Sequence, residues 1–521
     1  MSGGIQDETV SRLVARDTVP WYKKRNLTML YLTMLPACLG VEMTSGYDSS
    51  MINGLQAVAG WQKYFNYPDG AILGVLSSAY SLGTIFSLPF VPFIADRLGR
   101  KMSIVFGSII MVIGAILQTA TQSIAMFIIS CMLLGMGIPF AIVAASSLIG
   151  ELSHPKERAR LGSIFNASWH PGAVIAAGVT LGTFNRHDTW SWRIPSVLQL
   201  LPSAFQLIFI WWAPESPRWL VSKGRNEEAL AILVKYHAEG DENSELAKAE
   251  FTMIEQTLEI EMVHVKRSRM EMVATSGMRK RILVASFLGL ATQWSGNGLT
   301  SYYLSPILTS IGITDNHTKN IINLGLTCWG FVNATVFAFN STKFPRRRIY
   351  LICTTSILFV FTGLTIASAR FAITGGIAAS RATIVMIFLY SPAYNIGFNA
   401  LTYTFLVELF PYHARARGIT IFQAWGRCAG FFNQFVNPIG LKSIAWKYYI
   451  SYCVWIAVEV LFVFFFFPET HGKTLEELSF LYESDMAVEQ RNRVAAKLGQ
   501  NGAGNDNDSS DSKNPLVEHN V

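Results

Sequence analysis

Charged residues are scarce in this chain. Asp, Glu, Lys and Arg make up 15% of its 521 residues, whereas a soluble globular protein carries about 25%. Hydrophobic residues make up 51%, and the charges that do occur are bunched between long apolar runs. This distribution is typical of a helical membrane protein that crosses the bilayer many times, and it excludes a soluble enzyme.

The signatures of an enzyme site are also missing. The chain has no glycine-rich phosphate loop, no nucleophile elbow and no cluster of metal ligands, so we expect neither catalysis nor a cofactor. Its six cysteines all lie within apolar runs without paired spacing, which predicts no disulfide framework and no metal site. The polar first 26 residues contain no cleavable signal peptide, so the first hydrophobic run is expected to direct insertion.

Twelve apolar runs are present, each close to the roughly 20 residues that a membrane helix needs. They lie near 28–47, 71–94, 103–121, 125–149, 163–183, 195–213, 282–306, 320–341, 349–369, 381–406, 418–438 and 447–467. The predicted fold class is therefore an all-α membrane protein with twelve transmembrane helices in two six-helix pseudo-repeats. The expected parts are an N-terminal segment (1–27), two bundles (28–213 and 282–467), a linker (214–281) and a tail (468–521).

The linker and the tail differ in composition. EEALAILVKYHAEG and ELAKAEFTMIEQTLEIEMV in the linker have the spacing of amphipathic surface helices. The tail becomes polar from about residue 485 and ends in Gly, Asn, Asp and Ser. We therefore expect helices in the linker and a mostly disordered tail.

The net charge of +7 does not indicate nucleic-acid binding, because membrane proteins collect Lys and Arg in their cytoplasmic loops. RLGRK, KERAR, KFPRRR and RAR lie in loops on one side, and the linker and the N-terminal segment are also basic. Both termini are thus predicted to be cytoplasmic. The sequon at Asn316 then falls in a short outside loop and is a candidate glycosylation site.

The two halves repeat each other. GELSHPKERAR is echoed by VELFPYHARAR, PESPR by PETHG, and DRLGRK by TKFPRRR, in the same order and roughly 250 residues apart. An internal repeat of this size is an architectural signal. Parallel repeats of six spans build one class of transporter, whose substrate site lies between the halves near the middle of the membrane.

PESPRWL, PETHGKTLEEL, DRLGRK, WRIP and ELFPYHARARG together resemble the landmarks of the sugar-porter family of major facilitators. QWSGNGLTSYYL, NQFVNP and WKYY are most similar to the fungal lactose- and cellodextrin-permease-like members. The resemblance implies a major facilitator fold in the plasma membrane, with proton-coupled uptake of a disaccharide or hexose by alternating access. The implied partners are a sugar, protons and membrane lipid.

Charged residues gather at the predicted cytoplasmic helix ends. Ion pairs that cross from one bundle to the other can bias two states that differ by a few kcal/mol, although one exposed pair contributes only about 0–1 kcal/mol. The candidate gate residues are Asp96, Arg97, Arg100, Glu151, Arg158, Glu215 and Arg218 in the first half and Glu408, Arg415 and Glu469 in the second. The alternative is that they are ordinary solvated charges of basic loops.

A sugar site needs amide and hydroxyl side chains and an aromatic platform. Gln293 and Asn297 are one helical turn apart in the seventh span, so we expect them to face one cavity. The resemblance matches Gln293 and Tyr302 to sugar contacts of the family. The candidate substrate-binding residues are Gln293, Asn297, Tyr302, Tyr303, Asn166, Tyr403, Asn333 and Gln423. The alternative for each is a hydrogen bond between helices.

Asp48 ends the first span in SGYDSS and is the candidate proton-coupling residue, since carboxylates inside membranes serve as proton relays. In the proton-coupled members that the chain resembles, an arginine on the fourth span is its partner, and Cys131 stands at that position here. Passive facilitation therefore stays open.

Other cargoes and one other class of protein remain as alternatives. The cargo could be a polyol, a quinate-like ring compound or a secondary metabolite. A carboxylate would want a cationic partner, and His170 is the one cationic candidate that we assign to mid-span. The other class is a non-transporting sugar sensor.

Overall fold

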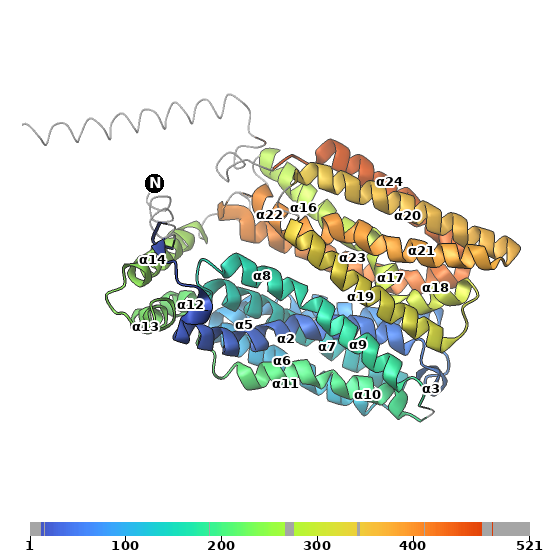
Figure 1. The fold of residues 1–521 in the computed structure, drawn as a ribbon, viewed down its shortest axis with the longest axis horizontal. Helices are drawn as coiled ribbons and strands as arrows, with labels where there is room; N and C mark the ends of the chain where they lie inside the picture. Colours follow the sequence, from blue (N-terminus) through green and yellow to red (C-terminus); the bar gives the residue numbers. More distant parts are fainter. Residues whose placement is uncertain are drawn as a thin grey trace, which may run out of the picture.

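The computed structural model describes residues 12–14, 16–186, 188–265, 276–340, 344–410, 412–470 and 482. Within them every regular element is a helix. Figure 1 shows two stacked halves, with the N-terminal half (blue to green) below the C-terminal half (yellow to red). The predicted tail lies outside the described residues from 471 onward, apart from Tyr482.

The N-terminal half contains six spans. Three are unbroken helices, and the others are helix pairs that meet at a kink. In chain order they are α2 (Arg25–Leu55), α4 with α5 (Gly70–Ser87 and Val91–Leu98), α6 (Arg100–Thr119), α7 (Ile124–Leu152), α8 with α9 (Arg158–Ala167 and Trp169–Thr183) and α10 with α11 (Trp190–Leu198 and Leu200–Phe209). A short helix, α3 (Ala59–Tyr64), follows the first span.

The C-terminal half repeats this plan. Its spans are α16 with α17 and α18 (Ser276–Trp294, Asn297–Tyr302 and Leu304–Ser310), α19 (Asn316–Asn340), α20 (Arg346–Thr374), α21 with the π-helical η3 and α22 (Ile377–Tyr394, Asn395–Asn399 and Ala400–Leu409), α23 (Tyr412–Ile444) and α24 (Tyr448–Phe466). Two short 3₁₀ turns, η1 (Trp21–Lys23) and η4 (Ala445–Lys447), precede α2 and α24. The predicted arrangement of two six-helix repeats is confirmed.

Seven helical stretches of the described chain are long and apolar enough to cross a membrane by themselves. One of them, Arg417–Phe466, contains parts of two spans, α23 and α24. The other spans fall short because they are broken into pieces, as at Gln199 between α10 and α11, or because polar residues interrupt them, as in α19. Broken membrane helices are tolerated where neighbouring groups satisfy the freed backbone.

Close contact between helices depends on small residues at a few positions. A Cβ on Gly46 of α2 would lie 1.9 Å from the carbonyl oxygen of Trp169 on α9, and one on Gly172 would lie 2.1 Å from that of Met43. Such glycines let two membrane helices approach within contact of their main chains. They fix α2 against α9 along the face of the N-terminal half that meets α19.

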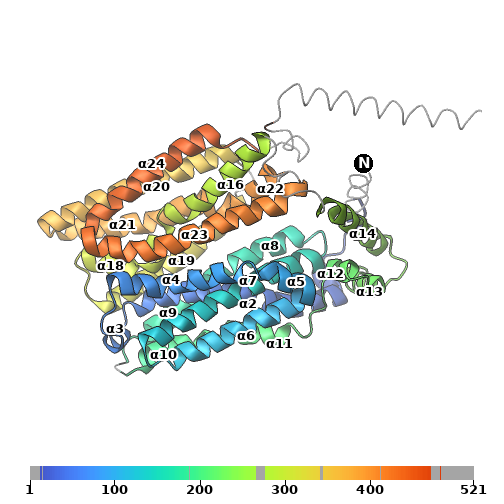
Figure 2. The same cartoon turned by 180° about the vertical axis from the view of Figure 1, so that it is seen from behind.

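Three linker helices lie at one end of the N-terminal half, which we call the linker end (Figure 2). They are α12 (Pro217–Ser222), α13 (Asn226–His237) and α14 (Glu245–Val265). The loop after α13 reaches the first span, where the Glu239 carboxylate accepts hydrogen bonds from the backbone N–H groups of Asn26 and Leu27, both at 3.0 Å. These are two of the donors that the start of a helix leaves without partners.

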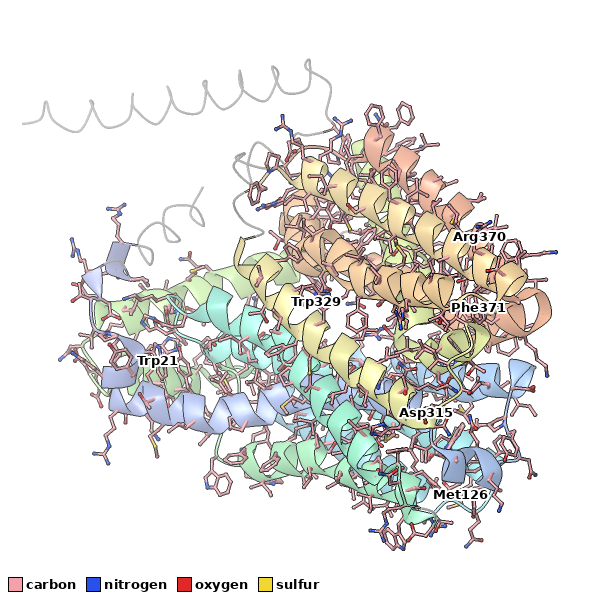
Figure 3. The ribbon with its side chains drawn as sticks, turned by 45° about the vertical axis from the view of Figure 1, so that its right-hand side comes forward. Trp21, Met126, Asp315, Trp329, Arg370 and Phe371 are labelled. Atoms are coloured by element: carbon pink, nitrogen blue, oxygen red, sulfur yellow. The ribbon has the colours of Figure 1, made fainter. Side chains whose placement is uncertain are left out.

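The opposite end of the bundle, which we call the α3 end, carries α3, α10 and α18. Figure 3 places Trp21 at the linker end and Met126 and Asp315 at the α3 end. The core of the C-terminal half is separate from the N-terminal clusters. Tyr303 is an exception, since it packs with Tyr47 and Trp61 of the N-terminal half.

Candidate functional site

The seventh span is broken where its polar residues lie. Helix α16 ends at Trp294, Gly296 adopts a left-handed conformation at φ +102°, and α17 begins at Asn297. No continuous helix therefore joins Gln293 and Asn297. Their spacing of one helical turn is not a reason to expect that they face one cavity. Glycine is the residue that adopts this conformation without strain.

An amide from α23 fills this break. Asn433 donates from Nδ2 to the carbonyl oxygen of Gln293 at 2.9 Å, and its Oδ1 accepts from the Tyr452 hydroxyl at 2.6 Å. A Cβ on Gly298 would lie 2.5 Å from the same Nδ2, so a glycine is needed there. The break thus has a partner for its freed carbonyl, as a membrane interior requires.

Side chains of the N-terminal half bond the next break, between α17 and α18. The Asn53 Oδ1 accepts from the backbone N–H of Leu304 at 3.2 Å, and Gln56 donates from Nε2 to the carbonyl of Tyr302 at 2.8 Å. Asn53 also donates to Asn323 of α19 at 3.1 Å. Nearby, Lys442 and Asp69 form an ion pair at 2.7 Å. These bonds join the two halves at the α3 end.

Several predicted substrate residues lie on helices that face the join between the halves. Gln293 packs against α23, where a Cβ on Gly430 would lie 3.3 Å from its Oε1. Gln423 donates to the Tyr403 hydroxyl at 2.5 Å, which links α23 to α22. Asn297 accepts from the Ser301 hydroxyl at 3.2 Å and is half-buried, as is Tyr302.

The sequence analysis missed a cation of this region. Arg427, near the middle of α23, interacts electrostatically with Glu42 of α2 and with Tyr403. The statement that His170 is the cationic candidate in mid-span is therefore wrong. A lone arginine inside the apolar run FQAWGRCAGFF was the signal, because such residues face a cavity or a partner rather than lipid. His170 itself lies 6.2 Å from the ring of Phe331, again between the halves.

Two other candidates are engaged elsewhere. Tyr303 is fully buried, and its hydroxyl donates to the carbonyl of Gln434. Asn333 donates to the Trp329 carbonyl of its own helix at 2.6 Å and to the Ser391 hydroxyl of α21 at 3.0 Å, so both of its amide hydrogens are used within the C-terminal half. Asn166 lies in α8, and its side chain is outside the described residues.

Asp48 does not end the first span, which was the expectation. Helix α2 continues to Leu55, so Asp48 lies within it and is 3% exposed. One carboxyl oxygen accepts a hydrogen bond from Gln199 at the kink between α10 and α11, and the other has no hydrogen-bond partner. Cys131 accepts a long contact from Gln118 at 3.9 Å.

The gate candidates of the first half form a cage at the linker end. Arg100 contacts Glu151 at 3.3 Å and Asp96 at 3.6 Å. Glu215 accepts from the backbone N–H of Arg100 at 3.0 Å, and Ser216 donates to Glu151. With Arg218 and Trp219, several of these groups line a cavity of about 380 Å³.

The second half builds the same cage around a residue that the prediction omitted. Arg346 contacts Glu408 at 3.1 Å, and its backbone N–H donates to Glu469 at 2.9 Å. Thr470 donates to Glu408 at 2.5 Å, in the place that Ser216 takes in the first half. Each cage lies within its own half, whereas the prediction had ion pairs that cross between the halves.

The remaining predicted residues do not belong to either cage as described above. Arg97 is exposed and stacks on Phe93 at 5.6 Å, and Arg158 begins α8. The side chain of Arg415 lies outside the described residues. Asn316 is the first residue of α19, so the sequon lies in the first helical turn at the α3 end, whereas a loop was expected.

Comparison with known proteins agrees with this arrangement. The family model described as "Sugar (and other) transporter" matches residues 33–482. The high-affinity glucose transporter of Kluyveromyces lactis is 28% identical over 88% of this chain and 86% of its own. The arabinose-proton symporter of Bacillus subtilis is 27% identical over 89% of this chain and 97% of its own.

Solved structures share the fold. The inward-open conformation of the xylose transporter XylE from E. coli superposes with a TM-score of 0.72, at 21% identity, over 87% of this chain and all of that one. Its partially occluded inward-open form gives 0.71.

Proposed function

Since the chain belongs to the sugar (and other) transporter family, and is therefore a transporter and not an enzyme, we propose that it imports a neutral sugar of the hexose class together with a proton. The relatives named for glucose and for arabinose with protons support this choice of cargo and of coupling. Lactose and cellobiose, which the fungal permease-like motifs predict, are tested beside it.

The observation that carries the proposal is Asp48. A carboxyl group buried in a membrane protein is costly in its charged form unless a cation pairs with it. Asp48 has an amide as its described partner and one oxygen without a hydrogen bond. A proton would neutralise it at low cost, and the neighbouring Tyr80 and Tyr302 interact with its charge. Asp48 is therefore the residue at which we propose that the coupled proton binds.

The proposed sugar contacts are Gln293, Asn297, Tyr302, Tyr403 and Gln423. Amides and phenol hydroxyls supply the donors and acceptors that sugar hydroxyls need, and aromatic rings can pack on the apolar face of the sugar. We propose that the linker, and with it both termini, faces the cytoplasm of a plasma-membrane protein, because the basic loops lie at the linker end. The α3 end is then the outer end, and it is the closed one.

A second candidate cargo rests on Arg427. This cation lies on α23 and interacts electrostatically with Glu42 of α2 and with Tyr403. A guanidinium group binds carboxylates in a bidentate way, so a quinate-like acid would find a partner there. The neutral sugar remains the first choice because the other proposed contacts are amides and hydroxyls.

The test is uptake of labelled glucose, lactose, cellobiose and quinate into cells that lack their own carriers, at external pH 5 and pH 8. For a proton symporter, one sugar accumulates faster at pH 5, and Asp48→Asn only equilibrates it across the membrane. Asp241→Asn, at an exposed linker position, is the matched control. Saturable uptake without accumulation would establish a facilitator, and uptake of quinate alone would replace the sugar with the acid.

A further inference from the structure

A cavity of about 220 Å³ lies at the α3 end and takes its walls from both halves. The N-terminal half contributes the end of α2, helix α3 and the start of α4, and the C-terminal half contributes α18, the end of α23 and the start of α24. The polar lining residues used in the argument are Gln56, Trp61, Gln62, Ser305, Thr309 and Ser310. None of the proposed central sugar contacts lines this cavity.

The wall offers hydrogen-bonding groups that have no use within the described structure. Trp61 is 2% exposed and Gln56 is 3% exposed, yet the Trp61 Nε1 and the Gln56 Oε1 have no hydrogen-bond partner. Buried polar atoms of this kind are rare, because leaving one unpaired costs about 1–3 kcal/mol. A ligand or water in the cavity would supply the missing partners.

The charges at the rim cancel. Asp69 and Lys442 line the cavity and pair with each other at 2.7 Å, one from each half. What remains is an indole, two amides and four hydroxyls, without an unpaired charge among the described lining residues. The Thr309 and Ser310 hydroxyls donate to carbonyls of their own helix and offer their oxygens as acceptors. Pockets with an apolar and aromatic lining and a few placed polar groups suit small uncharged ligands, and this set suits a ring that carries several hydroxyls.

We propose that this cavity is a second binding site for a neutral monosaccharide, open to the outside and present only while the outer end is closed. The inference goes beyond the transport activity, and it uses the proposed orientation. When the halves separate at this end, the wall that carries Trp61 leaves the wall that carries Thr309, and the site is divided. A sugar bound to both walls therefore stabilises the closed arrangement, since a ligand shifts a two-state equilibrium toward the state that it binds better.

This site predicts that external sugar inhibits its own uptake at high concentration. At low concentration, external sugar binds to the central site whenever the outer end opens. At high concentration the outer cavity fills during the closed phase and delays the next opening. The uptake rate then rises, passes a maximum and falls.

The test measures the initial rate of D-glucose uptake over a wide range of external concentration. Thr309→Trp fills the cavity from α18, and Ser310→Phe does so from the next position in case the first variant fails to reach the surface. Thr374→Trp is the matched control, since Thr374 is also exposed and its hydroxyl also bonds the carbonyl four residues back. The wild type and Thr374→Trp should show the maximum, whereas the filled variants should reach a plateau.

A second readout separates this inference from the proposed cargo. Hydrogen exchange of the purified protein in lipid nanodiscs is measured with and without D-glucose, which needs no transport. Protection of α3 and α18 by the sugar, lost in Thr309→Trp, supports the site even if D-glucose is not carried. Uptake that saturates without a maximum, together with no protection of α3 and α18, overturns the site and leaves the transport function intact. A maximum that persists in the filled variants also overturns it.

Discussion

Asn433 and Gly298 act as a pair at the broken seventh span. The asparagine reaches the Gln293 carbonyl only because position 298 has no side chain, since a Cβ there would lie 2.5 Å from the amide nitrogen. The same amide oxygen is held by Tyr452. The glycine therefore serves the hydrogen bond of its neighbour, and not only the bend of its own helix.

Gly298→Ala is expected to displace the Asn433 amide and lower the stability by about 1–3 kcal/mol, the cost of a buried group left without its partner. Gly178→Ala is the control, because a Cβ at that glycine meets nothing within 4 Å. The thermal unfolding midpoint of both variants in the same detergent decides the matter. Equal midpoints for the two variants would contradict the pairing.

Single residues were predicted from the sequence unevenly. The polar positions of the seventh span and Asp48 could be found because amides and carboxylates are rare in apolar runs. Their partners could not, since Gln199 meets Asp48 from 151 positions away. Arg427 was visible as a lone charge and was passed over. The roles of Tyr303 and Asn333 depend on packing directions that one sequence does not give.

At the scale of elements, the linker helices are fastened to the N-terminal half by histidines. His237 at the end of α13 bonds Glu250 of α14 at 2.5 Å and the Leu152 carbonyl of α7 at 3.1 Å. These two contacts hold α13 against both α14 and α7. The ring centroids of His154 and His237 lie 5.4 Å apart.

This contact should weaken in acid. Burial, and then the neighbouring His237 and Lys24, lower the pKa of His154 from 6.5 to about 4. When the linker helices are packed against the N-terminal half, His154 binds a proton less readily than when they are detached. The packed arrangement therefore loses stability as the pH falls from about 6.5 toward 4. Asp17 and Glu157 face the same ring and offset part of this loss.

Hydrogen exchange of α13, corrected for intrinsic rates, is the measurement. Protection should fall between pH 7 and pH 5 in the wild type and should change less in His154→Gln. His317→Gln, at an exposed histidine of the α3 end, should behave as the wild type does. A pH response that survives His154→Gln unchanged would assign the effect to another group.

The order of the elements was predictable, whereas their interruptions were not. Twelve apolar runs give twelve spans because each must cover the hydrocarbon thickness. The extra eight residues of α2, from Asp48 to Leu55, contain Asn53 and other polar residues, and they remain helical because Asn53 and Asp48 have partners outside α2. Hydropathy alone ends the span too early.

At the scale of the whole molecule, the two halves carry matching cages. Arg100 and Arg346 each pair with a carboxylate of their own half, and Glu215 and Glu469 each accept from the backbone at the start of a helix. The sequence repeat predicted this likeness. It did not identify Arg346 as the counterpart of Arg100, because the residues around Thr342 depart from the first-half motif.

Arg100→Gln and Arg346→Gln should therefore lower stability by similar amounts, about 2 kcal/mol each, below the roughly 3–5 kcal/mol of a fully buried pair. The carboxylates that they leave behind, Glu151 and Glu408, are 15% and 16% exposed. Arg97→Gln is the control, as an exposed arginine stacked on Phe93. A large loss in one half and none in the other would show that the cages are not equivalent.

The bonds that close the α3 end have a consequence for how the protein can diversify. Asn53 and Gln56 bind main-chain atoms of Leu304 and Tyr302, and not their side chains. These two bonds are thus indifferent to which side chains stand at positions 302 and 304, whereas the packing of Tyr303 into the N-terminal half is not. A substitution at 302 that changes cargo preference therefore leaves the acceptor of the Gln56 bond in place, so selectivity and this part of the seal can evolve on separate atoms.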